Sequence, residues 1–476
     1  MKLLYIDLFC GAGGTSTGVE NARYEGRQCA KVVGCVNHNA NAIASHAANH
    51  PDAMHFTEDI RTLELSPLTA HIAEMRRQYP DAFVVLWASL ECTNFSKAKG
   101  GQPRDADSRT LAEHLFRYIE VINPDYIQIE NVEEFMSWGD LDESGKPISK
   151  DAGRLYRQWV ANVCEYGYLF AHRILNSADF GAYTSRRRFF GIFAKGSLPI
   201  VFPEPTHSKD GATGLFGQMQ RWKPVRDVLD FSDEGESIFE RKKQLVDATL
   251  ERIYAGLIKF VAGGKEAFMV KWNSMSQTGK YHAPSIDDPC PTIATQNRLG
   301  VVQVSFLSKY YGGSPEGKNV SVEEPAGAIT TSDHHAFITA YYGNGTPCDV
   351  ESPAPTVTTN PKHRLVTCRM EQECAIAITF DDSPAMAKIK RFMALYGIID
   401  IKMRMLRIPE LKRIMGFPSD YVLVGTQADQ KKFIGNAVEV NMARVLCEAL
   451  CTRLIEGNLR PVPYKSNIIQ WKNSHE

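Results

Sequence analysis

The chain has 476 residues, of which 43% are hydrophobic and 23% charged, so it is long enough for two or three domains with a sizeable core. Its formal charge of −1 excludes a general polycation, and any binding of phosphates therefore needs a local positive region. No window approaches 18 uninterrupted apolar residues, and the short apolar start leads into a glycine loop. We therefore expect a cytoplasmic protein with neither a membrane span nor a secretion signal.

The first 210 residues or so alternate apolar strand-like runs with amphipathic stretches. This alternation predicts an α/β fold, Rossmann-like, with a mostly parallel sheet and helices on both faces. A helix is expected over residues 108–122, because its leucines and isoleucines share one face and Pro124 then ends it. The apolar runs that predict strands are residues 3–9, 32–37, 83–90 and 126–132.

The composition changes after about residue 235. A charged stretch over residues 237–261 predicts a helix, and short β-like pieces rich in Thr, Gly, Pro and Tyr follow to about residue 370. Three related segments, each followed by a polar turn and a short apolar run, predict a separate β-rich domain. They are residues 289–295, 325–331 and 353–359.

Four segments carry residues suited to chemistry. The loop CGAGG lies between a predicted strand and a helix, where glycines let a nucleotide-like cofactor approach the backbone, although a plain tight turn explains it equally well. Cys92 follows the third predicted strand, at the sheet edge where α/β folds bind ligands, whereas a lone cysteine is more often a small core residue. Glu130 ends the next strand between apolar residues, which suits a proton-handling carboxyl group or a simple capping acid.

The fourth segment is the basic run before the apolar strand FFGIFA. In a strand, Arg186 and Arg188 share one face and Arg187 points to the other. Two guanidiniums on the buried face need carboxylates or an anionic ligand, whereas a solvated basic turn would need none.

Six segments, in this order and with these spacings, resemble the DNA (cytosine-5) methyltransferases. The resemblance covers the whole chain except the β-rich region and the extreme C-terminus. The segments are DLFCGAGG (7–14), ECTNFS (91–96), ENV (130–132), SRRR (185–188), RMLRIPELKRIMGFP (404–418) and IGNAV (434–438).

The resemblance implies the fold of S-adenosylmethionine-dependent methyltransferases, with S-adenosylmethionine as the cofactor. Phe9 would stack on the adenine, Asp59 would accept a hydrogen bond from the adenine amino group, and Asn37 stands where the family has a ribose-binding acid. The implied cofactor-binding residues are Phe9, Gly11, Gly13, Asn37, Asp59, Asn436 and Val438.

The resemblance also implies a covalent mechanism on a cytosine flipped out of the duplex. Cys92 would add to C6 while Glu130 hydrogen-bonds N3 and the exocyclic amine. Arg188 would hold the cytosine carbonyl oxygen, and Arg186 would favour the thiolate or position the sugar-phosphate. The chain departs from the family at Glu91, Thr93 and Thr184, where the family usually has Pro, Gln and Gln. We expect a working variant, because the Cys, the Glu and both Arg are present together.

By the same resemblance, we expect a catalytic and cofactor-binding domain at residues 1–235, a target-recognition region at 236–398, a returning segment at 399–455 and a tail at 456–476. Arg298, His334 and Lys362 stand three residues after the last threonine of each repeat, and we expect them to face DNA. Residues 261–370 hold nine basic and nine acidic side chains, so there is no general basic patch.

The expected partner is double-stranded DNA, and the expected state is a monomer, with a partner restriction endonuclease as a further possibility. The eleven cysteines include no C-x-x-C pair, so we expect reduced thiols and no metal site. The alternatives are a cytosine-5 methyltransferase acting on RNA and a catalytically silent DNA- or cofactor-binding regulator. A Rossmann oxidoreductase explains neither Cys92 nor the paired arginines.

Overall fold

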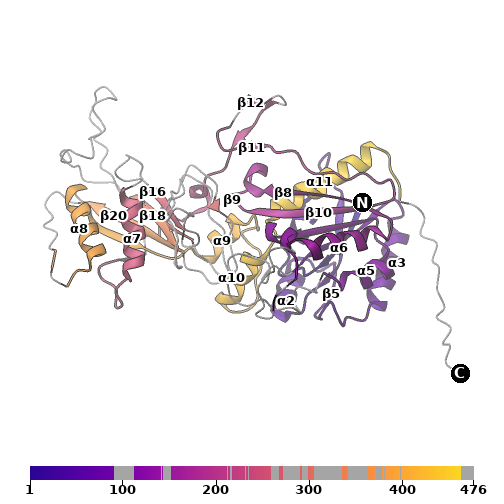
Figure 1. Ribbon diagram of the computed structural model, residues 1–476, viewed down its shortest axis with the longest axis horizontal. Helices are drawn as coiled ribbons and strands as arrows, with labels where there is room; N and C mark the ends of the chain where they lie inside the picture. Colours follow the sequence, from indigo (N-terminus) through magenta and orange to yellow (C-terminus); the bar gives the residue numbers. More distant parts are fainter. Residues whose placement is uncertain are drawn as a thin grey trace.

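The computed structural model contains two large sheets arranged along its long axis (Figure 1), together with four two-stranded ladders among the described residues. Helices α9 (Ile408–Ile414) and α10 (Gln427–Asn436) lie between them (Figure 1). No helix in the described part of the chain is both long and apolar enough to span a lipid bilayer. The structure describes residues 1–90, 112–140, 142, 152–211, 213–214, 217–230, 232–233, 235–258, 267–271, 290–291, 299–304, 335–340, 363–370, 378–379, 381–396 and 398–461.

The first sheet has seven strands, and the first five of them in spatial order run parallel to one another. The strand at position six is antiparallel to both of its neighbours. All four strands predicted from apolar runs are present, so the predicted mostly parallel α/β sheet is confirmed. In spatial order the strands are β5 (Met54–Phe56), β4 (Ala30–Val36), β1 (Leu3–Leu8), β6 (Phe83–Ser89), β7 (Tyr126–Asn131), β10 (Arg187–Lys195) and β8 (Tyr168–Asn176).

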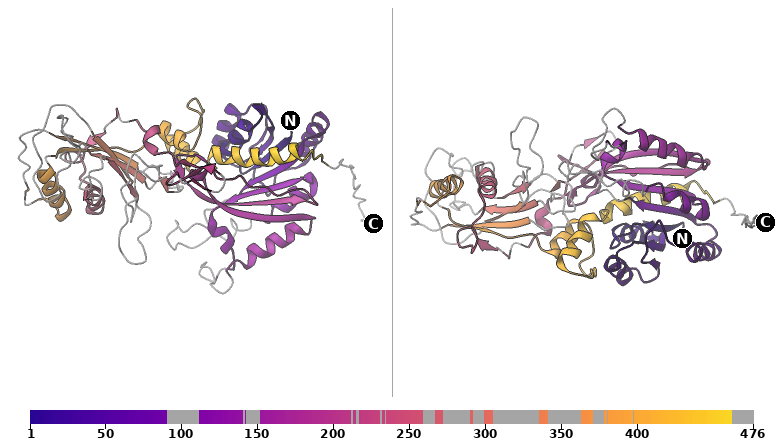
Figure 2. Two further views of the ribbon diagram at one scale, coloured as in Figure 1. Left: turned by 90° about the horizontal axis from the view of Figure 1, so that it is seen from above. Right: turned by 60° about the horizontal axis from the view of Figure 1, so that its bottom comes forward.

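Side chains that alternate along the strands divide the core between the two faces of this sheet. Leu4 and Ile6 of β1 join the buried cluster on one face, whereas Leu3 and Tyr5 join the cluster on the other. The two layers of helices are seen edge-on in Figure 2. The first face is covered by α3 (Ser66–Gln78), α5 (Leu115–Ile122) and α6 (Arg154–Cys164), and the second by α1 (Gly14–Asn21) and α11 (Val440–Glu456).

The helix expected over residues 108–122 is shorter within the described residues. Residues 112–114 form a turn, and α5 begins at Leu115. It ends where Asn123 adopts a left-handed conformation directly before Pro124, which is the predicted end.

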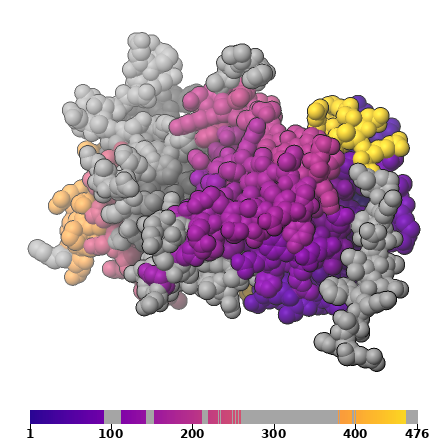
Figure 3. Space-filling view, turned by 45° about the vertical axis from the view of Figure 1, so that its right-hand side comes forward, coloured from indigo at the N-terminus to yellow at the C-terminus, as the bar shows by residue number. Residues whose placement is uncertain are grey.

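The C-terminal helix α11 returns to the start of the chain. A Cβ placed on Gly14 would lie 2.5 Å from the carbonyl oxygen of Val438, so only glycine allows this approach of α1 to the returning segment. At the other end of α11, the Lys2 ammonium donates to the carbonyl of Leu459 at 2.6 Å. The end of α11, in yellow, therefore lies at the surface beside the indigo N-terminal part of the chain (Figure 3).

The second sheet is antiparallel throughout. The three short apolar runs predicted after the repeats all lie in its strands, at β18, β19 and β20. Two helices, α7 (Asp247–Gly256) and α8 (Pro384–Tyr396), pack against each other, with Tyr254 and Phe392 in edge-to-face contact. In spatial order the strands are β15 (Glu236–Ser237), β21 (Ile398–Met403), β20 (His363–Met370), β19 (His335–Ala340), β18 (Leu299–Val304) and β16 (Ala267–Lys271).

Two expected boundaries differ from this arrangement. The helix predicted over residues 237–261 begins only at Asp247, because Glu236 and Ser237 pair with β21 instead. The boundary expected after residue 398 falls inside β21, so the chain leaves the second sheet only after Met403. In both cases, pairing between distant segments outweighs the local composition.

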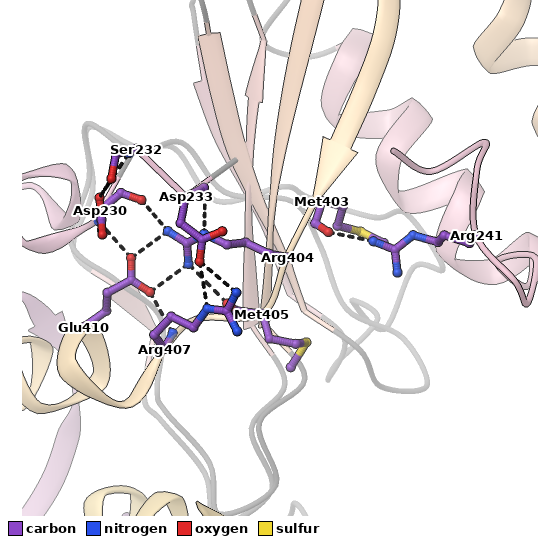
Figure 4. Close-up of polar contacts among 9 residues, drawn as sticks. All are labelled: Asp230, Ser232, Asp233, Arg241, Met403, Arg404, Met405, Arg407 and Glu410. Carbon is purple, nitrogen blue, oxygen red and sulfur yellow. Dashed lines mark hydrogen bonds and ion pairs between the residues drawn. The ribbon is translucent and has the colours of Figure 1, made fainter. Parts of the chain in front are cut away.

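A buried ion pair on the returning crossing between the sheets also binds the outgoing crossing. Arg404 and Glu410 are 5% and 1% exposed, and both carboxylate oxygens of Glu410 lie 2.9 Å from the Arg404 guanidinium. Arg404 also donates to the carbonyl oxygens of Asp230 and Asp233 on the outgoing crossing (Figure 4). We call this cluster of Asp230, Asp233, Arg404, Arg407 and Glu410 the joint.

Candidate active site

The candidate site lies at the carboxyl edge of the seven-stranded sheet. The strand register aligns Phe56, Val36, Leu8, Ala88 and Ile129 in one row across five strands. The residues that follow this row therefore emerge side by side, at the edge where α/β sheets bind ligands. β10 begins at the same edge because it runs in the opposite direction.

The loop after β1 turns sharply at Phe9, Gly11 and Gly13, whose φ angles are 60°, 54° and 100°. Left-handed backbone is unusual for a residue such as Phe9 and is a recognised sign of a functional position. From beneath, Tyr421 supports the loop by donating from its hydroxyl to the Ala12 carbonyl at 2.5 Å. The next residue, Gly14, starts α1.

Asn37 and Asp59 follow the neighbouring strands. Both are partly exposed, and the backbone N–H of Asn37 donates to Phe56 at 3.1 Å, which keeps the two strand ends together. The Asp59 carboxylate pairs with Arg61 at 2.7 Å, and this contact lowers the pKa of Asp59 to about 2. Asp59 is therefore ionised at neutral pH and can accept hydrogen bonds.

Glu130 and Arg188 form a buried ion pair. The Arg188 Nε lies 3.2 Å from Glu130 Oε1, and the two side chains are 10% and 7% exposed. Burial raises the pKa of Glu130, although Arg188 and Arg186 oppose this shift. In register, Glu130 lies beside Ser89 at the end of β6 and beside Phe190 of β10.

Arg186 is buried near the same carboxyl group, and its Nη1 donates to the carbonyl of Gly435 at 3.2 Å. Arg187 points the other way and is exposed, paired with Glu133 at 2.8 Å. This alternation is as predicted from the sequence. Just before Arg186, β9 (Thr184–Ser185) pairs with β17 (Cys290–Pro291), which belongs to the first of the three repeats.

The returning segment reaches the glycine loop. Val438 is buried in the core against α1, and the preceding Asn436 is exposed at the end of α10. Val438 thus lies against Gly14, directly after the loop that carries the predicted cofactor-binding residues Gly11 and Gly13.

A polar network behind the loop was not predicted from the sequence. Ser16 donates to buried Asp7 at 2.8 Å and contacts His46 at 2.9 Å. His46 in turn contacts His55 at 2.9 Å. Burial raises the pKa of Asp7 to about 7 and lowers the pKa of His46 well below its usual value. The three histidines at residues 46, 50 and 55 were the available signal, but their spacing matches no known motif.

Four predicted site residues lie outside the described residues. Cys92 follows Leu90, the last described residue after β6, by two positions. The other three are Arg298, His334 and Lys362.

Curated relatives include bacterial type II methyltransferases and a plant DNA (cytosine-5)-methyltransferase. A type II methyltransferase, M1.HphI of Haemophilus parahaemolyticus, is 29% identical over 216 residues, which is 45% of this chain and 52% of the relative. M.AgeI of Thalassovita gelatinovora is 29% identical over 44% of each chain. The DNA (cytosine-5)-methyltransferase 2 of Arabidopsis thaliana is 23% identical over 94% of this chain and 29% of its own length. The alignments with the first two thus span about half the length of each relative.

Solved structures resemble the chain over most of its length. The methyltransferase EhMeth of Entamoeba histolytica has a TM-score of 0.47 and 14% identity, covering 95% of this chain and 99% of its own. Among family models, that of the C-5 cytosine-specific DNA methylases matches residues 3–452. Because this match spans nearly the whole chain of 476 residues, the chain belongs to the C-5 cytosine-specific DNA methylase family.

Proposed function

We propose that the chain is a DNA (cytosine-5) methyltransferase that acts on a cytosine flipped out of double-stranded DNA. The observation that carries the proposal is the buried Glu130–Arg188 pair, which lies at the same sheet edge as the glycine loop. β6, the strand between them, leads directly to Cys92. A carboxyl group and two guanidiniums thus lie at one edge, and the last described residue after β6 at that edge, Leu90, precedes Cys92 by two positions.

The residues at this edge fit S-adenosylmethionine. A Cβ built on Gly11 would meet no atom within 4 Å, so the backbone faces open space where a cofactor can approach. Asp59 is held ionised by Arg61 and would accept from the adenine amino group. Asn37 would hydrogen-bond the ribose hydroxyls, and Phe9 would stack on the adenine. When bound, S-adenosylmethionine supplies an electrophilic methyl group on its sulfonium.

The protein's own groups would prepare the cytosine. Carbon 5 is too weak a nucleophile unaided, so the Cys92 thiolate adds to C6 and forms an S–C6 bond. Glu130, whose pKa is raised by burial, gives a proton to N3 and accepts from the exocyclic amine. Carbon 5 would then take the methyl group and lose its proton to water, and the electron pair of that C–H bond would re-form the C5–C6 double bond and expel the Cys92 thiolate. N3 would return its proton to Glu130, which restores both the neutral base and the starting state of the carboxyl group.

The arginines would hold the base and its backbone. Arg188 is positioned against Glu130 and would donate to the cytosine carbonyl oxygen. Arg186 lies nearer the returning segment and would favour the thiolate or position the sugar-phosphate. The pairing of β17 with β9 brings the first repeat beside Arg186, which supports target recognition by the region over residues 236–398.

Methyl-transfer assays test the proposal. We expect Cys92→Ala to abolish transfer of labelled methyl to DNA, whereas Cys164→Ala, at a partly buried free thiol on α6, leaves it unchanged. Equal transfer by Cys92→Ala and wild type would end the covalent mechanism. Bisulfite sequencing of DNA from cells that express the chain would then reveal the target sequence.

Trapping with 5-fluorocytosine separates the alternatives. The enzyme should form a stable covalent adduct with a duplex DNA that carries 5-fluorocytosine, since loss of fluorine cannot replace loss of the C5 proton. An adduct only with RNA would favour an RNA methyltransferase. Binding without an adduct on either would favour a catalytically silent regulator.

The biological setting is part of the same proposal. Curated relatives are named type II methyltransferases, which supports a place beside a restriction endonuclease. We further propose that the chain acts as a monomer in the cytoplasm.

A further inference from the structure

Three metal-ligating side chains converge behind the glycine loop, away from the base pocket. They come from three separate elements: Cys35 from β4, His46 from α2 (Ala40–Asn49) and His55 from β5. Their ligand atoms all lie within 4.8 Å of one another. Cys35 and His46 are fully buried, and His55 is partly exposed.

Hydrogen bonds orient His46 toward this cluster. With Asp7 ionised, the Ser16 hydroxyl gives its proton to the Asp7 carboxylate at 2.8 Å and accepts from His46 Nε2, which lies 2.9 Å away. The His46 proton is therefore on Nε2, and its Nδ1 lone pair faces His55 Nε2 at 2.9 Å. A carboxylate behind a ligating imidazole is the usual second layer of a metal site.

The donor set selects the kind of ion. One thiol and two imidazoles suit a borderline-soft divalent ion such as Zn²⁺. A tetrahedral zinc ion with bonds of roughly 2.0–2.3 Å holds its ligand atoms roughly 3.3–3.8 Å apart. The separations here, from 2.9 Å to at most 4.8 Å, bracket that range, so side-chain rotation suffices to close the site.

The glycine loop carries a candidate for the fourth ligand, the buried thiol of Cys10. Cys10 belongs to the same buried cluster as Cys35, and its backbone N–H donates to the carbonyl oxygen of Val36, the next residue along β4 from Cys35, at 3.3 Å. Binding of a divalent ion would displace both thiol protons, and the proton on His55 Nε2 would pass to its Nδ1, so that both imidazoles bind in the neutral form.

We propose that Cys35, His46 and His55 bind a structural Zn²⁺ ion, with Cys10 as the fourth ligand. The ion fastens β4, α2 and β5 behind the glycine loop and takes no part in methyl transfer. The inference goes beyond the proposed function, and it revises the expectation from cysteine spacing that there is no metal site, because the ligands lie in three elements rather than in one motif.

Metal content tests the proposal directly. The full chain, purified from cells grown with added zinc, should carry one zinc ion per chain by elemental mass spectrometry. Cys35→Ser and His55→Gln should lose it. Cys447→Ser is the matched control, since Cys447 is an equally buried free thiol on α11, and it should keep the ion. Retention of zinc by Cys35→Ser at the wild-type level would overturn the assignment.

Cobalt gives a readout that does not depend on a folded variant. Wild-type protein stripped with a chelator should, on titration with Co²⁺, develop the intense visible bands of tetrahedral cobalt and a near-ultraviolet thiolate band. Zn²⁺ should then abolish both and raise the midpoint of thermal unfolding by several degrees. Folded wild-type protein that shows neither bands nor a shift would refute the site.

Discussion

Two buried carboxylate–guanidinium pairs in different regions of the chain have very different surroundings. At the joint, Glu410 accepts four hydrogen bonds, two from the Arg404 guanidinium and one each from the backbone N–H groups of Asp230 and Arg407, at 2.7–2.9 Å. At the sheet edge, Glu130 has one longer contact from Arg188, at 3.2 Å. Burial raises the pKa of Glu130.

The difference separates a structural ion pair, whose hydrogen bonds are all made within the protein, from a pair whose carboxyl group can still bind a ligand. A buried charge is expensive unless hydrogen bonds saturate it, and the joint meets that condition within the protein. Among the described residues, Arg188 makes an ion pair with Glu130 and Arg186 adds its nearby charge, so the carboxyl group retains donor and acceptor capacity for a ligand. A flipped cytosine in the pocket would supply further hydrogen-bond partners for the Glu130 carboxyl group.

The largest expected effect is on methyl transfer by Glu130→Gln. The amide keeps the size of the side chain but cannot give a proton to N3, so the rate should fall by roughly 10²–10⁴-fold. Single-turnover transfer of labelled methyl to DNA measures this fall. Unfolding should change less than in the joint variant described next, because Glu130 loses one contact of 3.2 Å whereas Glu410 gives up charge-assisted bonds within a set of four at 2.7–2.9 Å. A rate within threefold of wild type would contradict the role given to Glu130.

Glu410→Gln should act on stability instead. It removes the nearer counter-charge of the buried Arg404 guanidinium and leaves only the Asp233 carboxylate at 3.4 Å, so the cost should fall near the lower end of about 3–5 kcal/mol of unfolding free energy. Denaturant unfolding followed by tryptophan fluorescence measures this cost. Adding Arg404→Met should recover much of the loss, because the unpaired charge is then gone. If Glu410→Gln alone unfolds like wild type, the saturated pair contributes little and the comparison fails.

A third buried carboxylate, Glu439, lies between these extremes. It accepts from the backbone N–H groups of Asn441 and Met442 at 3.0 and 2.7 Å, and burial raises its pKa to about 7. Because the folded pKa lies above the unfolded value of 4.5, the folded state holds the proton more tightly. The stabilisation is complete below about pH 4.5 and is lost as the pH rises through about 7, by roughly 3 kcal/mol.

Glu439→Gln should remove this pH dependence. It also forfeits one capping hydrogen bond, at about 1 kcal/mol. Unfolding free energies of both proteins from pH 4 to pH 8 give a difference curve. The raised pKa of Glu439 predicts that the stability advantage of wild type over the variant shrinks and then reverses as the pH rises through about 7. A flat difference curve would show that Glu439 does not titrate between pH 4 and pH 8.

The sequence predicted correctly those features that depend on a single strand. Strand alternation predicted that Arg186 and Arg188 share the buried face, and the apolar runs after the repeats predicted β18, β19 and β20. It was not informative where distant segments meet. The joint binds Arg404 to a crossing more than 170 residues earlier, and His46 meets Ser16 from another element. Such contacts depend on tertiary packing, which no local periodicity encodes.

The smallest effect is expected one position away from the buried arginines. Arg187 is paired with Glu133 at 2.8 Å, but the two side chains are 60% and 40% exposed, so water screens the pair and Arg187→Ala should cost about 0–1 kcal/mol of unfolding free energy. Methyl transfer should stay within about twofold of wild type, whereas Arg188→Ala should lose most of it. DNA binding at several salt concentrations completes the test. A salt slope that falls by about one in Arg187→Ala would make this exposed guanidinium a phosphate contact. Exposure would then no longer separate the arginines that act on DNA from those that do not, because binding would draw on both faces of the strand.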